Sequence, residues 1–237
     1  MRTMNRRQAL HLLTACTAAT AIAPVLRVLP CLAASMPSVQ EERLLLGTIV
    51  GITAVAPSAR QAQEAIDAAF TTIGRLDAIL SRYNPCTPLA ALNTHGRLHD
   101  IPTELKTVLE YGIQLHKITA GRFDMTIAPV IDLLEHTQAN PDPADLREAL
   151  ALVDSRRIRL ANGHIALAQD MAITLDGVAK GYIADQAAQT LREHGIAHFL
   201  VDAGGDIRVQ GSPEGHSFGR PWVVAIEDPD KRAHYPT

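Results

Sequence analysis

The sequence predicts an α+β protein, because helical and strand patterns follow one another irregularly instead of alternating as βαβ units. Apolar residues recur at helical spacing from Ala62 to Leu80, which indicates a long amphipathic helix. Two alternating segments within residues 156–167 flank Asn162-Gly163, a dipeptide typical of a two-residue hairpin turn. We therefore expect antiparallel sheets packed against helices, with three further antiparallel strands at Phe199–Val201, Ile207–Val209 and Val223–Ile226.

The N-terminal elements have recognisable boundary signals. Residues 44–55 are rich in Leu, Ile and Val and are predicted to form one strand. Ser58 and Gln61 form a predicted capping box at the start of the long helix, which should end before Asn84. Further along the chain we predict a helix that is N-capped by Thr103 and ends near Gly121, a polar loop at 135–145 and a short helix at Leu146–Leu152. A strand should then end at Thr174-Leu175. The last predicted helix has Ile183, Ala187 and Leu191 on its apolar face and stops at Gly195.

The charge of the chain excludes one class of partner. Residues 1–34 contain four arginines and no acidic residue, so 18 of the 22 basic residues remain beyond them against 25 acidic ones. The net charge of that remainder is −7. Nucleic-acid binding requires a basic face that neutralises phosphates, so we expect no nucleic-acid partner.

The N-terminus has the composition of an export signal. Asn5-Arg6-Arg7-Gln8 contains the paired arginines of a twin-arginine signal, and an apolar run follows at residues 12–32. Cleavage near Ala33-Ala34 would release residues 35–237 as one domain into the periplasm. The alternative is lipid attachment at Cys16, which would tether the protein to the inner membrane facing the periplasm. Cleavage leaves Cys86 as the sole cysteine, so we expect no disulfide and no cysteine metal site.

A lysine between glycines is the most informative local feature. Lys180 lies between Gly177 and Gly181 where a helix is predicted to begin. Free N–H groups at a helix start together with a lysine suit an anion such as phosphate. The spacing matches neither a Walker A loop nor a G-x-G-x-x-G dinucleotide motif. The sequence therefore predicts an anion site outside the two commonest nucleotide signatures.

Three other residues have both a ligand-binding and a structural interpretation, and a fourth, Gly177, has a ligand-binding one. Tyr83 would stack on a flat ring or close a turn. Asp124 would accept hydrogen bonds from a ligand or cap the following turn. Asp176 would bind a ligand, cap the helix or pair with Lys180. Gly177 has a bare backbone that lets its carbonyl approach a cation or ligand closely.

Taken together and in order, five motifs across nearly 200 residues resemble the ApbE family of FAD:protein FMN transferases. Each motif alone is weak, but their shared order makes the resemblance specific. The motifs are Leu80-Ser81-Arg82-Tyr83-Asn84-Pro85 with Leu92-Asn93, Gly121-Arg122-Phe123-Asp124-Met125-Thr126, Leu175 to Asp185 with Lys180, Gly204-Gly205-Asp206-Ile207, and Pro221-Trp222 to Pro229.

The resemblance implies an ApbE-like mixed fold and a Mg²⁺-dependent reaction. Such enzymes split FAD, join FMN to a threonine hydroxyl of a partner flavoprotein and release AMP. By position, the resemblance implies that the Gly177 carbonyl is a Mg²⁺ ligand. It does not identify a catalytic side chain. It implies FAD contacts at Leu46, Tyr83, Arg122, Phe123, Asp124, Thr174, Asp176 and Lys180. Leu46 replaces a frequent Met of the family, and Thr174 replaces an acid.

The resemblance also predicts that the sequence is a C-terminally truncated form. The family's remaining Mg²⁺ ligands, an Asp and a Thr, are expected beyond Thr237, so we expect little transferase activity from the chain as written. Two alternative functions stay open: an FAD-binding carrier or assembly factor, and an FAD pyrophosphatase that modifies no protein. The expected partner is a membrane-associated or periplasmic flavoprotein acceptor.

Overall fold

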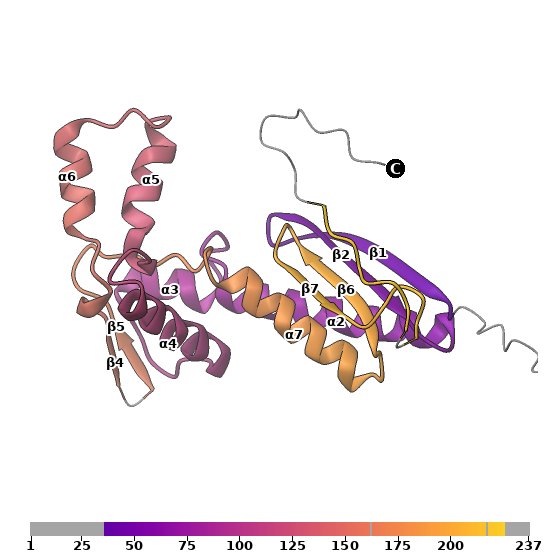
Figure 1. The fold of residues 1–237 in the computed structure, drawn as a ribbon. Coiled ribbons are helices and arrows are strands. Elements are labelled where there is room, and N and C mark those ends of the chain that lie inside the picture. The colour runs from indigo at the N-terminus through magenta and orange to yellow at the C-terminus, as the bar shows by residue number, and fades with distance from the viewer. Residues whose placement is uncertain (1–35, 162, 217, 226–237) are drawn as a thin grey trace, which may run out of the picture. The chain divides into compact units, whose positions relative to one another are not determined.

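A computed structural model of the protein describes residues 36–161, 163–216 and 218–225. The predicted signal peptide, Cys16 and the domain boundary at residue 34 lie outside these residues and stay predictions. Helices and antiparallel strands are mixed along the described chain (Figure 1), which confirms the predicted α+β class. Among the described residues, no helix combines the length and apolar composition needed to cross a membrane.

A four-stranded antiparallel sheet, in the order β1-β2-β6-β7, forms one layer of the fold. Its first two strands, β1 (Ser38–Leu45) and β2 (Thr48–Val55), correct the prediction of a single strand over residues 44–55. The chain reverses at Leu46 and Gly47, which both have positive φ, 56° and 69°. Two such residues in succession are typical of a tight hairpin turn. Leucine is unusual in this conformation, and this is why the apolar run gave no turn signal.

Strand β6 (His198–Ala203) pairs with β2 and with β7 (Ile207–Gln210), which confirms two of the three predicted C-terminal strands. Residues 221–225 form no strand, so the third prediction is wrong for Val223–Ala225, and Ile226 lies outside the described residues. The Trp222 indole N–H instead donates to the Gln210 carbonyl at 3.0 Å. A side chain therefore attaches this segment to the end of β7.

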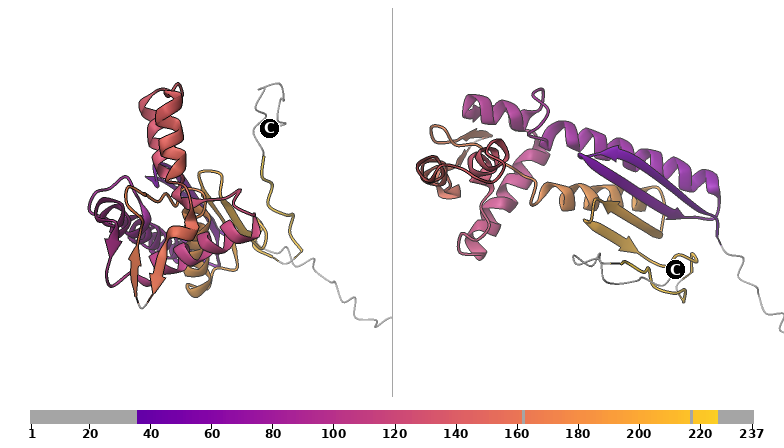
Figure 2. Two further views of the ribbon diagram at one scale, coloured as in Figure 1. Left: turned by 90° about the vertical axis from the view of Figure 1, so that its left-hand side faces the viewer. Right: turned by 90° about the horizontal axis from the view of Figure 1, so that it is seen from above.

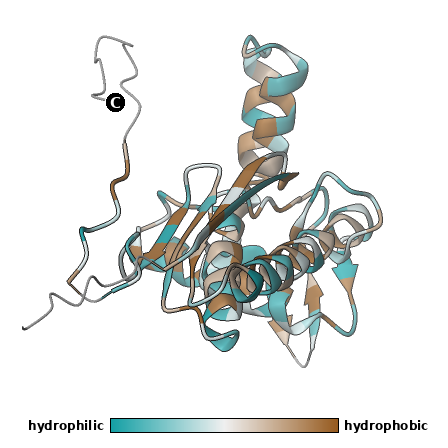
Figure 3. Cartoon of the chain, turned by 90° about the vertical axis from the view of Figure 1, so that its right-hand side faces the viewer, coloured by the Kyte–Doolittle hydropathy of each residue, from teal (hydrophilic) through white to brown (hydrophobic). Residues whose placement is uncertain are grey.

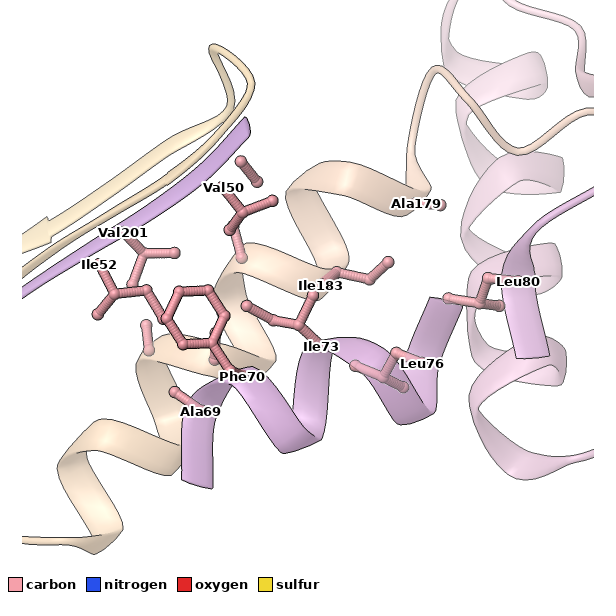
Figure 4. Packing of buried hydrophobic residues seen from close by; sticks show 14 of the residues in the cluster. Val50, Ile52, Ala69, Phe70, Ile73, Leu76, Leu80, Ala179, Ile183 and Val201 are labelled. Atoms are coloured by element: carbon pink, nitrogen blue, oxygen red, sulfur yellow. The ribbon is translucent and has the colours of Figure 1, made fainter. Parts of the chain in front are cut away.

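Two long helices, α2 (Ala59–Leu80) and α7 (Ala179–Glu193), cover one face of the sheet and pack against each other (Figure 1, Figure 2). The alternation along β2 and β6 directs the pairs Ile52–Val201 and Ala54–Phe199 into this layer, where all four side chains are buried. Figure 4 shows Phe70 of α2 close to Ile52 and Val201 of the strands, and Ile73 of α2 next to Ile183 of α7. Apolar and polar residues interleave along these elements, as expected for amphipathic helices (Figure 3).

The remaining elements form a second region beyond the ends of α2 and α7 (Figure 1). A small sheet in the order β3-β5-β4 contains the predicted hairpin around Gly163. Helices α5 and α6 pack against each other and are joined by residues 137–142, a shorter loop than predicted. The elements are α3 (Pro88–His95), β3 (Arg97–Leu98), α4 (Thr103–Ile118), the 3-10 helix η1 (Met125–Ile127), α5 (Ala128–His136), α6 (Pro143–Ala151), the 3-10 helix η2 (Ser155–Arg157), β4 (Arg159–Ala161) and β5 (His164–Ala166).

The helix caps differ in part from the predicted ones. Ser58 caps α2 as predicted, since its hydroxyl accepts from the Gln61 backbone N–H at 3.2 Å. The Gln61 side chain does not complete a capping box, because its amide donates to the His194 carbonyl at the end of α7. Helix α4 begins one residue earlier than predicted: Pro102 is the N-cap and Thr103 is helical. Gly195, with φ 77°, follows α7 as predicted.

Residues 173–175 are not a strand, contrary to the prediction. The Asn93 side chain takes the place of a partner strand: its Oδ1 accepts from the Ile173 N–H and its Nδ2 donates to the Ile173 carbonyl, both at 2.8 Å. The Thr174 N–H donates to the Met125 carbonyl at 2.8 Å. An extended segment that leads into α7 is thus held by α3 and η1.

A buried carboxylate joins α4, η1 and η2. Asp124 Oδ1 accepts hydrogen bonds from the Thr126 N–H, the Thr126 hydroxyl and the Ser155 hydroxyl, and Oδ2 accepts from the Ser155 N–H. His116 Nδ1 lies 3.0 Å from Oδ2. Burial raises the pKa of Asp124, but the bonds from Ser155 and Thr126 outweigh it and hold this pKa below its ordinary value of 3.8.

Replacing Asn93 with Ala is expected to lower the free energy of unfolding by about 2–4 kcal/mol, because two buried backbone groups of Ile173 lose their partners. Denaturant unfolding of the purified protein measures the change. His95→Ala, an exposed change in the same helix, serves as the control and should stay within about 0.5 kcal/mol of wild type. Equal stability of Asn93→Ala and wild type would contradict the proposed anchoring.

Asp124→Asn is expected to be less stable than wild type by about 2 kcal/mol or more at pH 7. A lowered folded-state pKa stabilises the protein above the unfolded pKa, and this contribution is lost as the pH falls through the folded pKa. The stability difference should therefore be constant between pH 7 and 5 and shrink below about pH 4. Asp170→Asn is the control, since Asp170 is exposed; a difference that does not change with pH would disprove the assignment.

Candidate functional site

The predicted site residues gather around the turn that precedes α7. The N–H groups of Val178 and Ala179 both donate to the Leu175 carbonyl, which forms a tight turn over Asp176 and Gly177. Val178 occupies the N-cap position of α7 and provides no side-chain cap. The first turn of this 15-residue helix therefore keeps free N–H groups, which favour an anion. Three hollows in the surface meet at this turn.

The first hollow, of about 200 Å³, lies between the end of α2, the β1–β2 turn and the start of α7. It brings together four predicted site residues from three parts of the sequence. Lys180, half-buried, forms no hydrogen bond or ion pair with any residue that the structure describes. Its ammonium group is therefore available to an anionic ligand. The lining includes Leu46, Tyr83, Asp176 and Lys180 of the predicted set, together with Asp77, Leu80 and Ser81.

The second hollow, of about 390 Å³, lies between the α4–η1 loop and the same turn. Asp176 lines both hollows, so they are neighbours on the two sides of this residue. All nine residues that sequence reasoning selected thus line one or the other. The second hollow contributes Arg122, Phe123, Asp124, Thr174, Asp176 and Gly177.

A third hollow, of about 560 Å³, opens between α4, α7 and the start of β7. Gly177 lines it as well as the second hollow, so its backbone lies at their junction. Tyr111 and Tyr182 contribute aromatic rings, and the Arg208 guanidinium pairs with the Asp185 carboxylate at 3.2 Å. No residue of the predicted set other than Gly177 lies here.

Asp176 is held by Tyr83, and not by Lys180. The Tyr83 hydroxyl donates to Asp176 Oδ2 at 2.9 Å. No ion pair joins Asp176 to Lys180, and Asp176 does not cap α7, which rules out two of its three predicted roles in this structure. With 48% of its side chain exposed, the carboxylate still faces solvent. Ligand contact is the interpretation of Asp176 that stays open.

Arg82 is a site residue that the sequence reasoning missed. Its side chain is 8% exposed, its Nη1 donates to Asp132 Oδ1 at 2.8 Å, and its guanidinium lies 4.8 Å from the Tyr83 ring centre. Its Nε lies 3.7 Å from Asp176 Oδ2 and has no hydrogen-bond partner. Burial opposes the charge, but the hydrogen bond to Asp132 helps to place the pKa of Arg82 above its usual value. Its position next to Tyr83 in the sequence was the available signal.

Gly177 allows a close approach of the Phe123 ring, whereas its φ lies outside the positive range, so its backbone conformation does not require glycine. A Cβ at this position would lie 3.1 Å from Phe123 Cε2, closer than ordinary van der Waals contact. The bare backbone predicted for a cation or ligand is therefore also what admits the Phe123 ring. This contact links the second motif of the sequence to the third.

Asp124 and Thr174 are largely occupied by the protein itself. Asp124 is 9% exposed and caps η1, which confirms the structural interpretation of this residue. Thr174 is buried, and its hydroxyl accepts from the Asp176 N–H at 3.2 Å. Both residues shape the second hollow, and direct contact of either with FAD stays a prediction.

The described residues contain oxygen donors beside the turn but no cluster of metal-ligating side chains. No group of three or more His, Cys, Asp or Glu side chains in this part of the chain is arranged around a metal position. Gly177 has a backbone carbonyl and Asp176 an exposed carboxylate, both hard oxygen donors, and both residues line the second hollow. Mg²⁺ commonly takes few protein ligands and completes its shell with water and phosphate oxygens, so this donor set fits Mg²⁺ held together with a phosphate ligand.

Known proteins share both the sequence pattern and the fold. The FAD:protein FMN transferase of Haemophilus influenzae is 30% identical over 168 residues, covering 65% of this chain and 47% of the relative. That of Salmonella typhimurium is 27% identical over 199 residues, covering 79% and 56%. The chain thus spans about half the length of the curated relatives it matches.

Solved structures show the same fold. The flavin transferase ApbE of Vibrio cholerae superposes with a TM-score of 0.71 at 23% identity, covering 83% of this chain and 66% of that one. The apbe protein of Thermotoga maritima gives 0.73 at 23% identity, covering 81% and 64%. A sequence model of the ApbE family matches residues 46–237, from the β1–β2 turn through all three hollows. With the five motifs in the same order, this match shows that the chain belongs to the ApbE family.

Proposed function

We propose that this protein binds FAD at the start of α7 and transfers its FMN moiety to a partner flavoprotein. One observation carries the proposal: nine residues, spread over 135 positions of the sequence from Leu46 to Lys180, gather around a single helix start. The named relatives act as FAD:protein FMN transferases, which supports the same activity here. A site extended over adjacent hollows suits a ligand as long as a dinucleotide.

The electrostatics of the helix start suit a pyrophosphate. Lys180 supplies a positive charge, and the free N–H groups of α7 supply donors beside it. Arg122 adds a second cation at the edge of the second hollow. Mg²⁺, held by the Gly177 carbonyl and phosphate oxygens, would neutralise charge on the transferred phosphoryl group. Tyr83 offers an aromatic face, 66% exposed, for a flat ring of the substrate.

The acceptor and the compartment belong to the same proposal. The acceptor group is a threonine hydroxyl, which attacks the FMN phosphorus while AMP leaves with the bridging oxygen. The acceptor is a membrane-associated or periplasmic flavoprotein, reached after export through the twin-arginine signal at Arg6-Arg7. Cleavage near Ala34 is the main route, and lipid attachment at Cys16 is the alternative.

Mass spectrometry tests this function. The full chain is incubated with FAD, Mg²⁺ and a flavoprotein domain that contains its acceptor threonine, and the acceptor is then weighed. A mass increase by one FMN on threonine supports transfer and would overturn the expectation of little activity from the chain as written. FAD binding without this increase would restrict the function to flavin binding, release of free FMN and AMP would indicate a pyrophosphatase, and absence of FAD binding would overturn the proposal.

Lys180→Ala is expected to weaken FAD binding about 10-fold or more, because the pyrophosphate loses a charge-assisted hydrogen bond. Titration of FAD with the protein, followed by flavin fluorescence, measures the affinity. Lys180→Arg should retain most of the affinity. Lys106→Ala, which removes an exposed lysine of α4, is the matched control and should bind like wild type. An unchanged affinity in Lys180→Ala would remove Lys180 from the site.

Gly177→Ala is expected to destabilise the protein by about 1 kcal/mol and to weaken FAD binding, because the new methyl group displaces the Phe123 ring. Gly74→Ala is the matched control: nothing lies within 4 Å of its added Cβ, so the helix propensity of Ala should stabilise α2. Thermal unfolding and FAD titration measure both effects. In a protein that already contains Phe123→Leu, Gly177→Ala should cause a smaller loss of stability than in wild type. An equal loss of stability would exclude the Phe123 contact as its cause.

A further inference from the structure

A fifth polar residue of the first hollow belongs to none of the motifs. Asp77 lies in the last turn of α2, four residues before Ser81, whose N–H donates to the Asp77 carbonyl. Its side chain lines the 200 Å³ hollow together with Tyr83, Asp176 and Lys180. These three belong to the proposed FAD site, so Asp77 shares a wall with it.

The position of Asp77 is unfavourable for a carboxylate in the protein without ligand. It is half-buried, and burial raises its pKa above the ordinary value. It lies near the C-terminal, negative end of the α2 dipole, where anions are disfavoured. It forms no hydrogen bond or ion pair with any of the described residues, whereas the exposed Glu64 and Asp67 of the same helix are each paired with an arginine.

The Asp77 oxygens are nevertheless accessible to a ligand. The only fully buried side-chain nitrogen or oxygen without a partner, among the residues that the structure describes, is Arg82 Nε. The Asp77 carboxylate is therefore not fully enclosed by protein, and Asp77 is one of the residues that line the hollow. Two acceptor oxygens without a partner among the described residues thus belong to a hollow that Lys180 also lines.

The chemistry of the hollow restricts what Asp77 binds. A phosphate is repelled by Asp77 and by Asp176, both of which line this space, and the matching partner for phosphate is Lys180. A neutral hydrogen-bond donor attached directly to the phosphate fits Asp77, because it brings no negative charge close to the carboxylate. In a nucleotide this neighbour is the sugar, whose hydroxyls suit the two oxygens of a carboxylate.

We propose that the Asp77 carboxylate accepts hydrogen bonds from sugar hydroxyls adjacent to the FAD pyrophosphate. These bonds fix the position of the dinucleotide along the hollows. The inference rests on the proposed FAD site. The hydroxyls come from the ribose of the AMP half or from the ribityl chain of the FMN half. Asp77 is a binding residue here, with no part in the transfer of the phosphoryl group.

FAD titration with Mg²⁺ on the full chain tests the assignment. Asp77→Ala should weaken FAD binding by about 10- to 100-fold, the usual effect of losing hydrogen bonds to a charged group. Asp77→Asn should lose less, since one acceptor oxygen remains. Glu64→Gln is the matched control, an exposed carboxylate earlier in the same helix, and should bind FAD like wild type. Thermal unfolding of each variant identifies losses that come from misfolding.

Fragments of FAD identify the sugar. Titrations with ADP and with FMN are repeated for wild type and Asp77→Ala. A loss confined to ADP assigns the ribose, and a loss confined to FMN assigns the ribityl chain. For the ribose, removing the 2′-hydroxyl or the 3′-hydroxyl of ADP should weaken binding to wild type and leave binding to Asp77→Ala unchanged.

The failures are distinguishable. If wild type binds no FAD, the proposed function fails and this inference fails with it. If wild type binds FAD and folded Asp77→Ala binds it equally well, the inference alone is overturned. Tighter binding by Asp77→Asn would also overturn it, because it would show that Asp77 only repels the phosphates.

Discussion

The packing of α2 and α7 on one face of the sheet is the constraint on which the rest of the structure depends. The two helices contact each other, and both bury small side chains, including Ala65 and Ala69 of α2 and Ala187 and Ala188 of α7, which favours a close approach of the backbones. Close packing fixes where each helix stops. The end of α2 and the start of α7 meet beside Leu80 and Ala179, as Figure 4 shows, and this is the wall of the first hollow. The anion-binding end of α7 is thus positioned by an apolar core.

Sequence patterns predicted the elements whose formation depends on interactions between residues close in sequence. The amphipathic stripe of α2, the glycine after α7 and the hairpin around Gly163 each depend on neighbours within a few residues, and all three are present. The prediction failed where tertiary contacts decide. Leu46 takes a left-handed conformation inside an apolar run, and Ile173 pairs with the side chain of Asn93, 80 residues away. Neither feature has a signal within a short window of sequence.

In the site as well, the residues were predictable from motifs, and their tertiary contacts were not. Motifs selected residues that do line adjacent hollows, but they did not determine which residues contact each other. Asp176 had three possible partners by sequence, and the structure assigns it to Tyr83 and Arg82, more than 90 residues earlier. No pattern in the sequence predicted that Arg82, next to an exposed tyrosine, would be buried. Asp77 was passed over because it lies inside a helix and outside every motif.

The charged groups around the first hollow have complementary roles. The buried Arg82 guanidinium forms ion pairs with Asp132 and Asp176, so it orders the turn and is not free for a ligand. Lys180 has no such partner among the described residues and is the free cation of the hollow. Asp77 is its counterpart, a carboxylate that pairs with no cation in the part of the chain that the structure describes. A ligand that satisfies both must present an anion and a neutral donor a few bonds apart. A phosphate attached to a sugar meets this requirement, and inorganic phosphate alone does not.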